Sequence, residues 1–296
     1  MPASSVPFYV IGVGRSGTTL LRLMLDGHSR LAVPGEAPWV TSVGLAAGAR
    51  PMKELLEEII THSRFHEWGL DESSARTAAA RRSPKTWPAL VDALFSAFAE
   101  KQSKNRWGDK TPTHIDHLPV LARWFPSAQF VHIVRDGRAV AASLAEQAWG
   151  PRNPMSASFY WRGAVQRARR YGARLGPTRY LEVRLEDLID DTQAGLERIC
   201  EFLEEPFETA MLDYPVRVAA TNKPIAPPHA ALALPPTPGL RDWRHEMTPL
   251  AQRAVESVCR PALKRFGYAV ARSSATGLIV AWADRVYGAT RKLARR

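Results

Sequence analysis

A strand that runs into a glycine-rich turn and then into a helix occupies residues 8–26 and constrains the fold more than any other stretch. Residues 8–13 form a short β-branched and aromatic run without helical periodicity, which predicts a buried strand. The helix is expected to begin near Gly17, because apolar residues recur on one face at positions 20, 21, 24 and 25. This order of elements is typical of α/β proteins with a parallel sheet.

The turn, residues 12–19, reads Gly-Val-Gly-Arg-Ser-Gly-Thr-Thr and has the spacing of a phosphate-binding loop. Nucleotide triphosphatases carry lysine where this chain has Thr18, so the charge that reaches the β- and γ-phosphates is missing. This difference argues against ATP or GTP hydrolysis. Converging backbone N–H groups, the helix N-terminus and the hydroxyls of Ser16, Thr18 and Thr19 can still bind phosphate or sulfate. A strand-to-helix turn without a ligand is the alternative.

The remaining elements predict one α/β domain. Further strands are expected at residues 31–33, 105–109, 130–134 and 179–185. Helical periodicity is present at 52–62, 87–101, 113–125, 139–149, 156–174, 192–203 and 249–266, and Thr113 is the expected cap of its helix. We expect a P-loop nucleotide-binding fold, with a central parallel sheet flanked by helices, over residues 1–270, including a helical insert at 45–104. Residues 271–296 have the pattern of a basic amphipathic helix.

Polar residues follow several of the predicted strands, and ligands of open α/β sheets bind at the carboxyl ends of strands. Glu36 comes just after the second strand and is a candidate general base, with a solvated surface carboxylate as the alternative. Lys110 ends the third strand and would lie beside the glycine-rich turn. Arg135 leaves the fourth strand, and Ser143 follows on the next helix, so both can reach one phosphate.

The chain carries a formal net charge of +11, which attracts polyanions. We found no helix-turn-helix signature, zinc-finger spacing or aromatic RNA-binding motif, so we do not expect a nucleic-acid partner. Cys200 and Cys259 lie in apolar helical patterns and are expected to be buried free thiols. No segment resembles a signal peptide or a transmembrane helix, so we predict a cytoplasmic protein. The Ala- and Arg-rich composition hints at a bacterial genome rich in G and C.

Four motifs in a fixed order connect the chain to a known family: the loop at 12–19, Pro-Gly-Glu at 34–36, Trp-Gly-Asp-Lys-Thr-Pro at 107–112 and Val-Arg-Asp-Gly-Arg at 134–138. With them the chain resembles sulfotransferases that use 3′-phosphoadenosine 5′-phosphosulfate (PAPS). It looks closest to the bacterial branch that is similar to tyrosylprotein sulfotransferases. The resemblance covers roughly residues 7 to 268, and it implies PAPS as co-substrate without a metal ion.

The resemblance also implies catalytic roles. The family's catalytic glutamate lies in a Gly-Glu pair, which assigns the general base to Glu36. His114 is the competing base, because another branch uses a histidine soon after its lysine; a histidine on the helix surface is the alternative, and we favour Glu36. A lysine of this motif lies near the oxygen that bridges phosphate and sulfur, a role carried over to Lys110. Arg15 is expected to help stabilise that leaving oxygen.

Donor binding is implied by the same resemblance. Arg135 and Ser143 would bind the 3′-phosphate, which distinguishes PAPS from ATP. Leu185 stands where relatives usually carry a tyrosine near the adenine, so that contact is lost or replaced. The segment with Gly239, Arg241 and Trp243 is expected to close over the nucleotide, with a basic loop packed by one tryptophan as the alternative. The 5′ end would be bound by the loop residues Gly14, Arg15, Ser16, Gly17, Thr18 and Thr19.

The predicted function is transfer of a sulfuryl group from PAPS to a hydroxyl or amine. A P-loop kinase of a small molecule remains open, although Thr18 argues against it, and so does a nucleotide-binding regulator without turnover. The acceptor is undetermined, since a small molecule, a carbohydrate, a lipid and a peptidyl tyrosine are all compatible. For the C-terminal helix we favour docking on the domain or homodimer formation over contact with a membrane surface.

Overall fold

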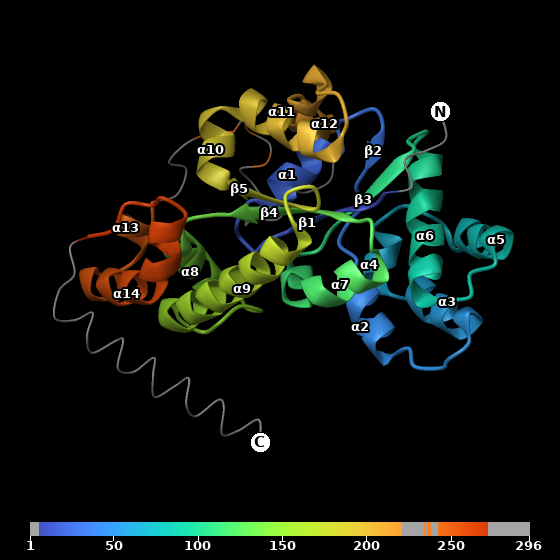
Figure 1. Ribbon diagram of the computed structural model, residues 1–296, viewed down its shortest axis with the longest axis horizontal. Coiled ribbons are helices and arrows are strands. Elements are labelled where there is room, and N and C mark those ends of the chain that lie inside the picture. Colours follow the sequence, from blue (N-terminus) through green and yellow to red (C-terminus); the bar gives the residue numbers. More distant parts are fainter. Residues whose placement is uncertain (1–5, 221–231, 233, 235, 238–241, 272–296) are drawn as a thin grey trace.

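The computed structural model describes residues 6–220, 232, 234, 236, 237 and 242–271 (Figure 1). Its centre is a five-stranded sheet with the order β2-β3-β1-β4-β5, in which all neighbouring strands are parallel. The strands are β1 (Phe8–Ile11), β2 (Leu31–Ala32), β3 (Arg106–Lys110), β4 (Gln129–Val134) and β5 (Tyr180–Arg184). This confirms the predicted α/β class with a central parallel sheet.

Helices cover both faces of the sheet (Figure 1). One face is covered by α1 (Thr18–Leu25), α10 (Leu185–Asp190), α11 (Thr192–Leu203), η2 (Thr209–Met211) and α12 (Tyr214–Ala220). The other is covered by η1 (Pro112–His117), α7 (Leu118–Trp124), α8 (Gly137–Ala145) and α9 (Pro154–Leu175). At the β5 side, α13 (Trp243–Glu246) and α14 (Pro249–Arg265) contact α8, and α14 also contacts α9.

The predicted insert forms a helical group beyond the β2 and β3 edge of the sheet (Figure 1). The group contains α3 (Met52–Ile60), α4 (Ser63–His66), α5 (Glu72–Arg82) and α6 (Trp87–Lys101) of the predicted insert at 45–104, and also α2 (Trp39–Ala46), which begins before that insert. Its aromatic side chains are buried: Trp39 lies 5.4 Å, centroid to centroid, from Trp68, whose ring lies 4.5 Å from Phe95. These aromatic residues therefore pack the core of this group.

Alternation along β1 explains how the two faces are built. Phe8 and Val10 belong to the core cluster beneath α1 and α11, whereas Tyr9 and Ile11 belong to the cluster on the opposite face. Successive side chains of a strand point to opposite faces, so a fully buried central strand must be apolar throughout.

Cys200 and Cys259 are buried free thiols, as expected. Within the described ranges no helix is both long and apolar enough to cross a membrane.

The expected helix over residues 113–125 with Thr113 as its cap is wrong. The chain instead forms the 3₁₀ helix η1 from Pro112 and then the α-helix α7 from Leu118, so Thr113 lies inside η1. Pro119 explains the break, because its ring would clash with the carbonyl of Ile115 in a continuous α-helix and its nitrogen has no proton to donate.

Candidate active site

The loop between β1 and α1 has a backbone that requires glycine. Gly17 has φ 87°, and Arg15 has φ 72°, in the region that side chains rarely adopt. A Cβ atom on Gly17 would lie 2.5 Å from the Leu185 side chain, and one on Gly12 would lie 2.7 Å from the Ile133 carbonyl oxygen. Gly17 precedes α1 without a side-chain cap, so the first N–H groups of the helix remain available to an anion.

Glu36 and Lys110 form an ion pair at this loop. The Lys110 Nζ lies 2.6 Å from the Glu36 Oε1 and 3.4 Å from the hydroxyl of Thr19 on α1. Thr111 fixes the neighbouring backbone, because its hydroxyl accepts a hydrogen bond from the Ala37 N–H at 2.8 Å. The ends of β2 and β3 and the start of α1 thus bring together a carboxylate, an ammonium and a hydroxyl.

The two partners of this pair differ in burial. The Lys110 side chain is 3% exposed, whereas the Glu36 side chain is 32% exposed. Burial lowers the pKa of Lys110, and the nearby carboxylate of Glu36 offsets only part of this effect. The site therefore holds a lysine ammonium with little hydration beside a carboxylate that solvent can reach.

His114 does not lie on a helix surface; it is fully buried on η1. Its Nδ1 lies 3.1 Å from the Oδ2 of Asp109 without hydrogen-bond geometry, and its ring contacts the edge of Tyr9 with centroids 6.2 Å apart. Glu36 lines the cavity described below, and His114 does not.

Arg15, Arg135 and Ser143 meet on the other side of the loop. The Arg15 Nε donates a hydrogen bond of 3.0 Å to the Ser143 hydroxyl, and the Arg135 Nη1 donates one of 3.0 Å to the Arg15 carbonyl oxygen. The sequence predicted that Arg135 and Ser143 share a ligand. The structure adds that the Arg15 side chain points toward this pair.

A cavity of about 920 Å³ at the carboxyl edge of the sheet joins the two groups. Among the predicted site residues, its walls contain Gly14, Arg15, Gly17, Thr18, Thr19, Glu36, Arg135 and Trp243. Ser16, Lys110 and Ser143 are buried behind these walls. Gly239 and Arg241 lie outside the described residues, as does the segment 272–296 with its predicted helix.

Other lining residues were not anticipated as ligands. Leu185 lines the cavity beside Gly17, and Trp149, which is 68% exposed, covers Gly14 from the segment after α8. Arg64 of α4 lines the cavity on the Glu36 side. Sequence reasoning missed Trp149 because it assigned this residue to the end of the helix predicted at 139–149, whereas α8 ends at Ala145. It missed Arg64 because that residue lies in a segment without periodicity or a motif.

Trp243 is the part of the expected lid that the structure describes. Its ring lies between two guanidinium groups, with Arg138 at 4.4 Å and Arg244 at 4.6 Å from the ring centroid. Such stacking is favourable because the ring face is negative. Trp243 is thus fixed at the wall of the cavity by α8.

Within the described part of the chain, no group of three or more His, Cys, Asp or Glu residues could hold a metal ion.

Comparisons with known proteins bear on the fold and the family. A putative protein-tyrosine sulfotransferase of Caenorhabditis briggsae is 25% identical over 216 residues, covering 70% of this chain and 68% of that protein. The sulfotransferase domain of the Synechococcus PCC 7002 olefin synthase has the same fold, with a TM-score of 0.63 at 22% identity over 90% of this chain and 96% of that domain. Mouse sulfotransferase SULT7A1 complexed with PAP matches with a TM-score of 0.50 at 12% identity, covering 97% of this chain and 91% of that one.

Several curated relatives are much longer than the matching region. This chain spans 29% of a matching protein from Aquifex aeolicus and 39% of the Drosophila melanogaster protein-tyrosine sulfotransferase. The model of the sulfotransferase family matches residues 7–209, which is more than half of the chain and includes β1 to β5 with the loop, Glu36, Lys110 and Arg135. The chain therefore belongs to the sulfotransferase family.

Proposed function

We propose that the chain transfers a sulfuryl group from PAPS to a hydroxyl or amine acceptor. One observation carries this proposal: a single cavity is lined by Glu36, which pairs with the buried Lys110, and by Arg15 and Arg135, which meet at the buried Ser143 on the other side of the glycine-rich loop. The Glu36–Lys110 pair is suited to accept a proton and to stabilise negative charge, and the arginines with Ser143 are suited to bind a phosphate. The PAP complex of a protein with the same fold supports this choice of donor.

Glu36 is the general base of the proposed reaction. The acceptor oxygen or nitrogen forms a bond to sulfur while the bond from sulfur to the bridging phosphate oxygen breaks. The acceptor proton passes to the Glu36 carboxylate, and the electron pair of the broken bond remains on the bridging oxygen. The exposed part of the Glu36 carboxylate can meet an acceptor that enters from the cavity.

Lys110 stabilises the negative charge that develops on the leaving oxygen, together with N–H groups of the loop and the hydroxyls of Thr18 and Thr19. The poor hydration of Lys110 strengthens this interaction, because a buried charge is screened less than an exposed one. A sulfuryl group carries less negative charge than a terminal phosphoryl group, so we propose that Lys110, the loop N–H groups and the two hydroxyls act without a metal ion.

Arg135 and Ser143 select the donor by binding its 3′-phosphate. Arg15 was expected to stabilise the leaving oxygen, but its Nε donates to the Ser143 hydroxyl, so we propose that it contributes to this phosphate site instead. Arginine suits this role because its planar guanidinium donates two parallel hydrogen bonds to a phosphate. The apolar side chain of Leu185, which lies beside Gly17, would then face the base of the nucleotide. For the acceptor, the protein-tyrosine sulfotransferases among the relatives make a peptidyl tyrosine the first candidate to test, before carbohydrates, lipids and other small molecules.

The decisive experiment is calorimetric titration with adenosine 3′,5′-bisphosphate and with ADP, without added metal. We expect the bisphosphate to bind at least about tenfold more tightly, because only it carries the 3′-phosphate. Arg135→Ala should remove this preference, and Arg123→Ala, which changes an exposed arginine on α7, should retain it. Equal binding of both nucleotides by the wild-type chain, or binding of ATP with Mg²⁺ alone, would contradict the proposal and favour a kinase or a regulator.

A further inference from the structure

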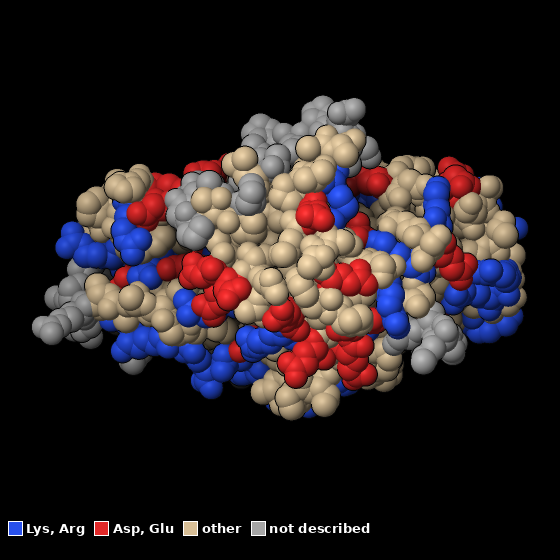
Figure 2. All heavy atoms as spheres, turned by 90° about the horizontal axis from the view of Figure 1, so that it is seen from above, with Lys and Arg blue, Asp and Glu red and all other residues tan. Residues whose placement is uncertain are grey.

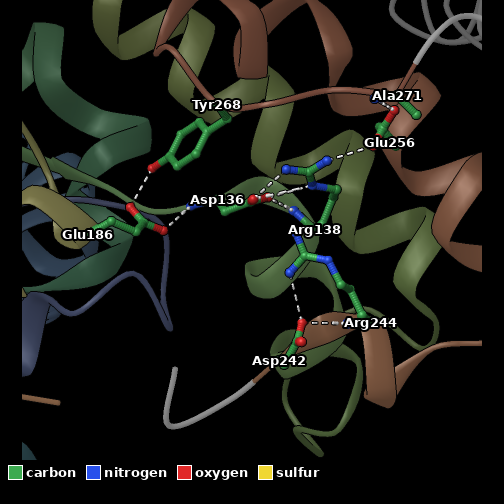
Figure 3. A network of polar contacts seen from close by, with 8 residues as sticks. All are labelled: Asp136, Arg138, Glu186, Asp242, Arg244, Glu256, Tyr268 and Ala271. Atoms are coloured by element: carbon green, nitrogen blue, oxygen red, sulfur yellow. Dashed lines mark hydrogen bonds and ion pairs between the residues drawn. The ribbon is translucent and has the colours of Figure 1, made fainter. Parts of the chain in front are cut away.

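The turn that follows Arg135 is held by a network of charged groups outside the proposed reaction (Figure 3). The Asp136 carboxylate accepts a hydrogen bond from the Arg138 backbone N–H at 2.8 Å, which caps α8. It also accepts two from the Arg138 guanidinium, with Nε to Oδ1 at 3.0 Å and Nη2 to Oδ2 at 2.7 Å. Arg138 is 4% exposed, so this pair is buried.

The same guanidinium ties the turn to α14. The Arg138 Nη1 donates to the Glu256 Oε2 at 2.6 Å, and the other oxygen of Glu256 accepts the Ala271 N–H at 2.8 Å (Figure 3). Burial lowers the pKa of Arg138, but the carboxylates of Asp136 and Glu256 more than offset this and raise it overall. The guanidinium is thus fixed between two carboxylates from different elements.

A second link reaches the same turn from the other side. The Asp136 backbone N–H donates to the Glu186 Oε1 at 3.0 Å, and the Glu186 Oε2 accepts the Tyr268 hydroxyl at 2.6 Å (Figure 3). The Arg184 guanidinium lies 4.4 Å from the centroid of the Tyr268 ring. Two residues of the C-terminal segment, Glu256 and Tyr268, therefore brace the turn from which Arg135 extends.

Burying so many polar groups costs desolvation energy, and apolar packing between α8 and α14 would avoid that cost. What the network provides is a fixed backbone directly after Arg135, since hydrogen bonds to charged groups are short and directional. Precise placement matters at a phosphate site, because a shift of about 1 Å of a binding group can cost a large part of its effect.

We propose that Tyr268 and Arg138 are positioning residues for recognition of a 3′-phosphate: through Glu186 and Asp136 they fix the turn that presents Arg135 to the cavity. This inference rests on the proposed function. It adds that the C-terminal segment, through Glu256 and Tyr268, determines how much more tightly a nucleotide with a 3′-phosphate binds than one without it.

The test compares the dissociation constants of adenosine 5′-monophosphate and adenosine 3′,5′-bisphosphate, whose ratio measures the contribution of the 3′-phosphate. Tyr268→Phe keeps the ring and removes the hydroxyl that holds Glu186. We expect the ratio to fall about fivefold while the monophosphate constant stays within about twofold of wild type. Tyr160→Phe is the matched control, because it removes a hydroxyl contact of 3.1 Å to Asp116, which is not a member of this network.

Arg138→Lys is the second variant, since it keeps one positive charge between Asp136 and Glu256 but loses the planar fork. It should lower the ratio at least as much as Tyr268→Phe. An unchanged ratio in both variants would overturn the inference, and so would an equal loss of affinity for both ligands, which indicates general structural support. A wild-type chain that binds both ligands equally would instead overturn the proposed function itself.

Discussion

Lys110 combines two properties that rarely coexist, a nearly complete burial and a charge. Its partner Glu36 is one third exposed, so the pair is asymmetric in hydration. Burial dominates and lowers the pKa of the lysine, which means that the protonated side chain is held at some cost to stability. Such a cost is common at functional sites, where groups are placed for chemistry rather than for stability.

This asymmetry predicts the alkaline limit of turnover. If protonated Lys110 stabilises the leaving oxygen, the rate falls as pH rises through the pKa of Lys110, whereas protonation of the base Glu36 limits the rate only on the acid side. Because burial lowers that pKa from 10.5, the fall should occur below pH 10.5. Lys110→Arg keeps its proton at all accessible pH values, so its profile should lose this fall even if its plateau is lower. The measurement is a pH–rate profile of the wild type and of Lys110→Arg. An identical alkaline fall in the variant would exclude Lys110 as the titrating group.

Gly17 offers a test of the loop backbone. Gly17→Ala would place a side chain at φ 87° and against Leu185, and we expect bisphosphate affinity to fall at least about tenfold because the loop N–H groups must turn away. Gly69→Ala is the matched control, since Gly69 has φ 67° but nothing lies near its Cβ position. The control should lose about 1–2 kcal/mol of stability and keep its affinity. Retained affinity in Gly17→Ala would show that the loop does not bind the anion.

At the scale of elements, the carboxyl and amino ends of the parallel strands have different roles. The carboxyl ends of β1, β3 and β4 carry the candidate site, and the amino ends carry a buried arginine, Arg106. Its guanidinium donates to the backbone carbonyls of Val6 and Leu203, to the Gln129 side chain and to Glu205, whose side chain is 1% exposed. Burial lowers the pKa of Arg106, while Glu205 raises it. This cluster joins β3, β4 and α11.

Arg106→Leu should therefore affect stability without affecting the site. It would leave the Glu205 carboxylate and the two carbonyl groups without this donor, and we expect the free energy of unfolding to fall by about 3–5 kcal/mol. Urea unfolding measures this, with Arg123→Leu, an exposed position, expected within about 0.5 kcal/mol of wild type. Bisphosphate affinity of the folded protein should be unchanged. A loss below about 1 kcal/mol, or a weakened affinity, would contradict this division of tasks.

Much of the architecture follows from local sequence. The strands and the residues at their carboxyl ends were predictable, because short apolar runs such as β1 and β4 and the motifs that follow the strands are signals of a few neighbouring residues. His114 was not, because η1 turns it toward Tyr9 instead of continuing the helical period. The ion pair between Arg138 and Glu256 was also missed. Glu256 lies 118 residues away in the sequence, where it cannot be distinguished from a solvated charge on a helix surface. Contacts between distant charged residues leave no periodic signal.

At the scale of the whole molecule, the charge of +11 bears on how an anionic donor arrives. Figure 2 shows Lys and Arg side chains densest toward both ends of one face and Asp and Glu densest in its middle, with some of each sign in every part, so on this face the two signs are interspersed. The described residues that line the cavity include four arginines and five carboxylates: Arg15, Arg64, Arg135, Arg244, Glu36, Asp136, Glu186, Asp190 and Asp242. The lining is therefore mixed in sign, and long-range attraction of an anion must come from the net charge of the whole chain, whose field extends beyond contact distance.

This field predicts a salt-dependent association rate. The Debye length shortens from about 30 Å at 0.01 M to about 10 Å at 0.1 M salt, so attraction outside the cavity should be largely screened over that interval. We expect the association rate constant of adenosine 3′,5′-bisphosphate, measured by stopped flow, to fall at least about threefold between these two concentrations, with a smaller change in the dissociation rate constant. Adenosine, which carries no phosphate, is the control and should associate at nearly the same rate in both. If the bisphosphate shows the same insensitivity, the net positive charge serves a purpose other than capture of the donor.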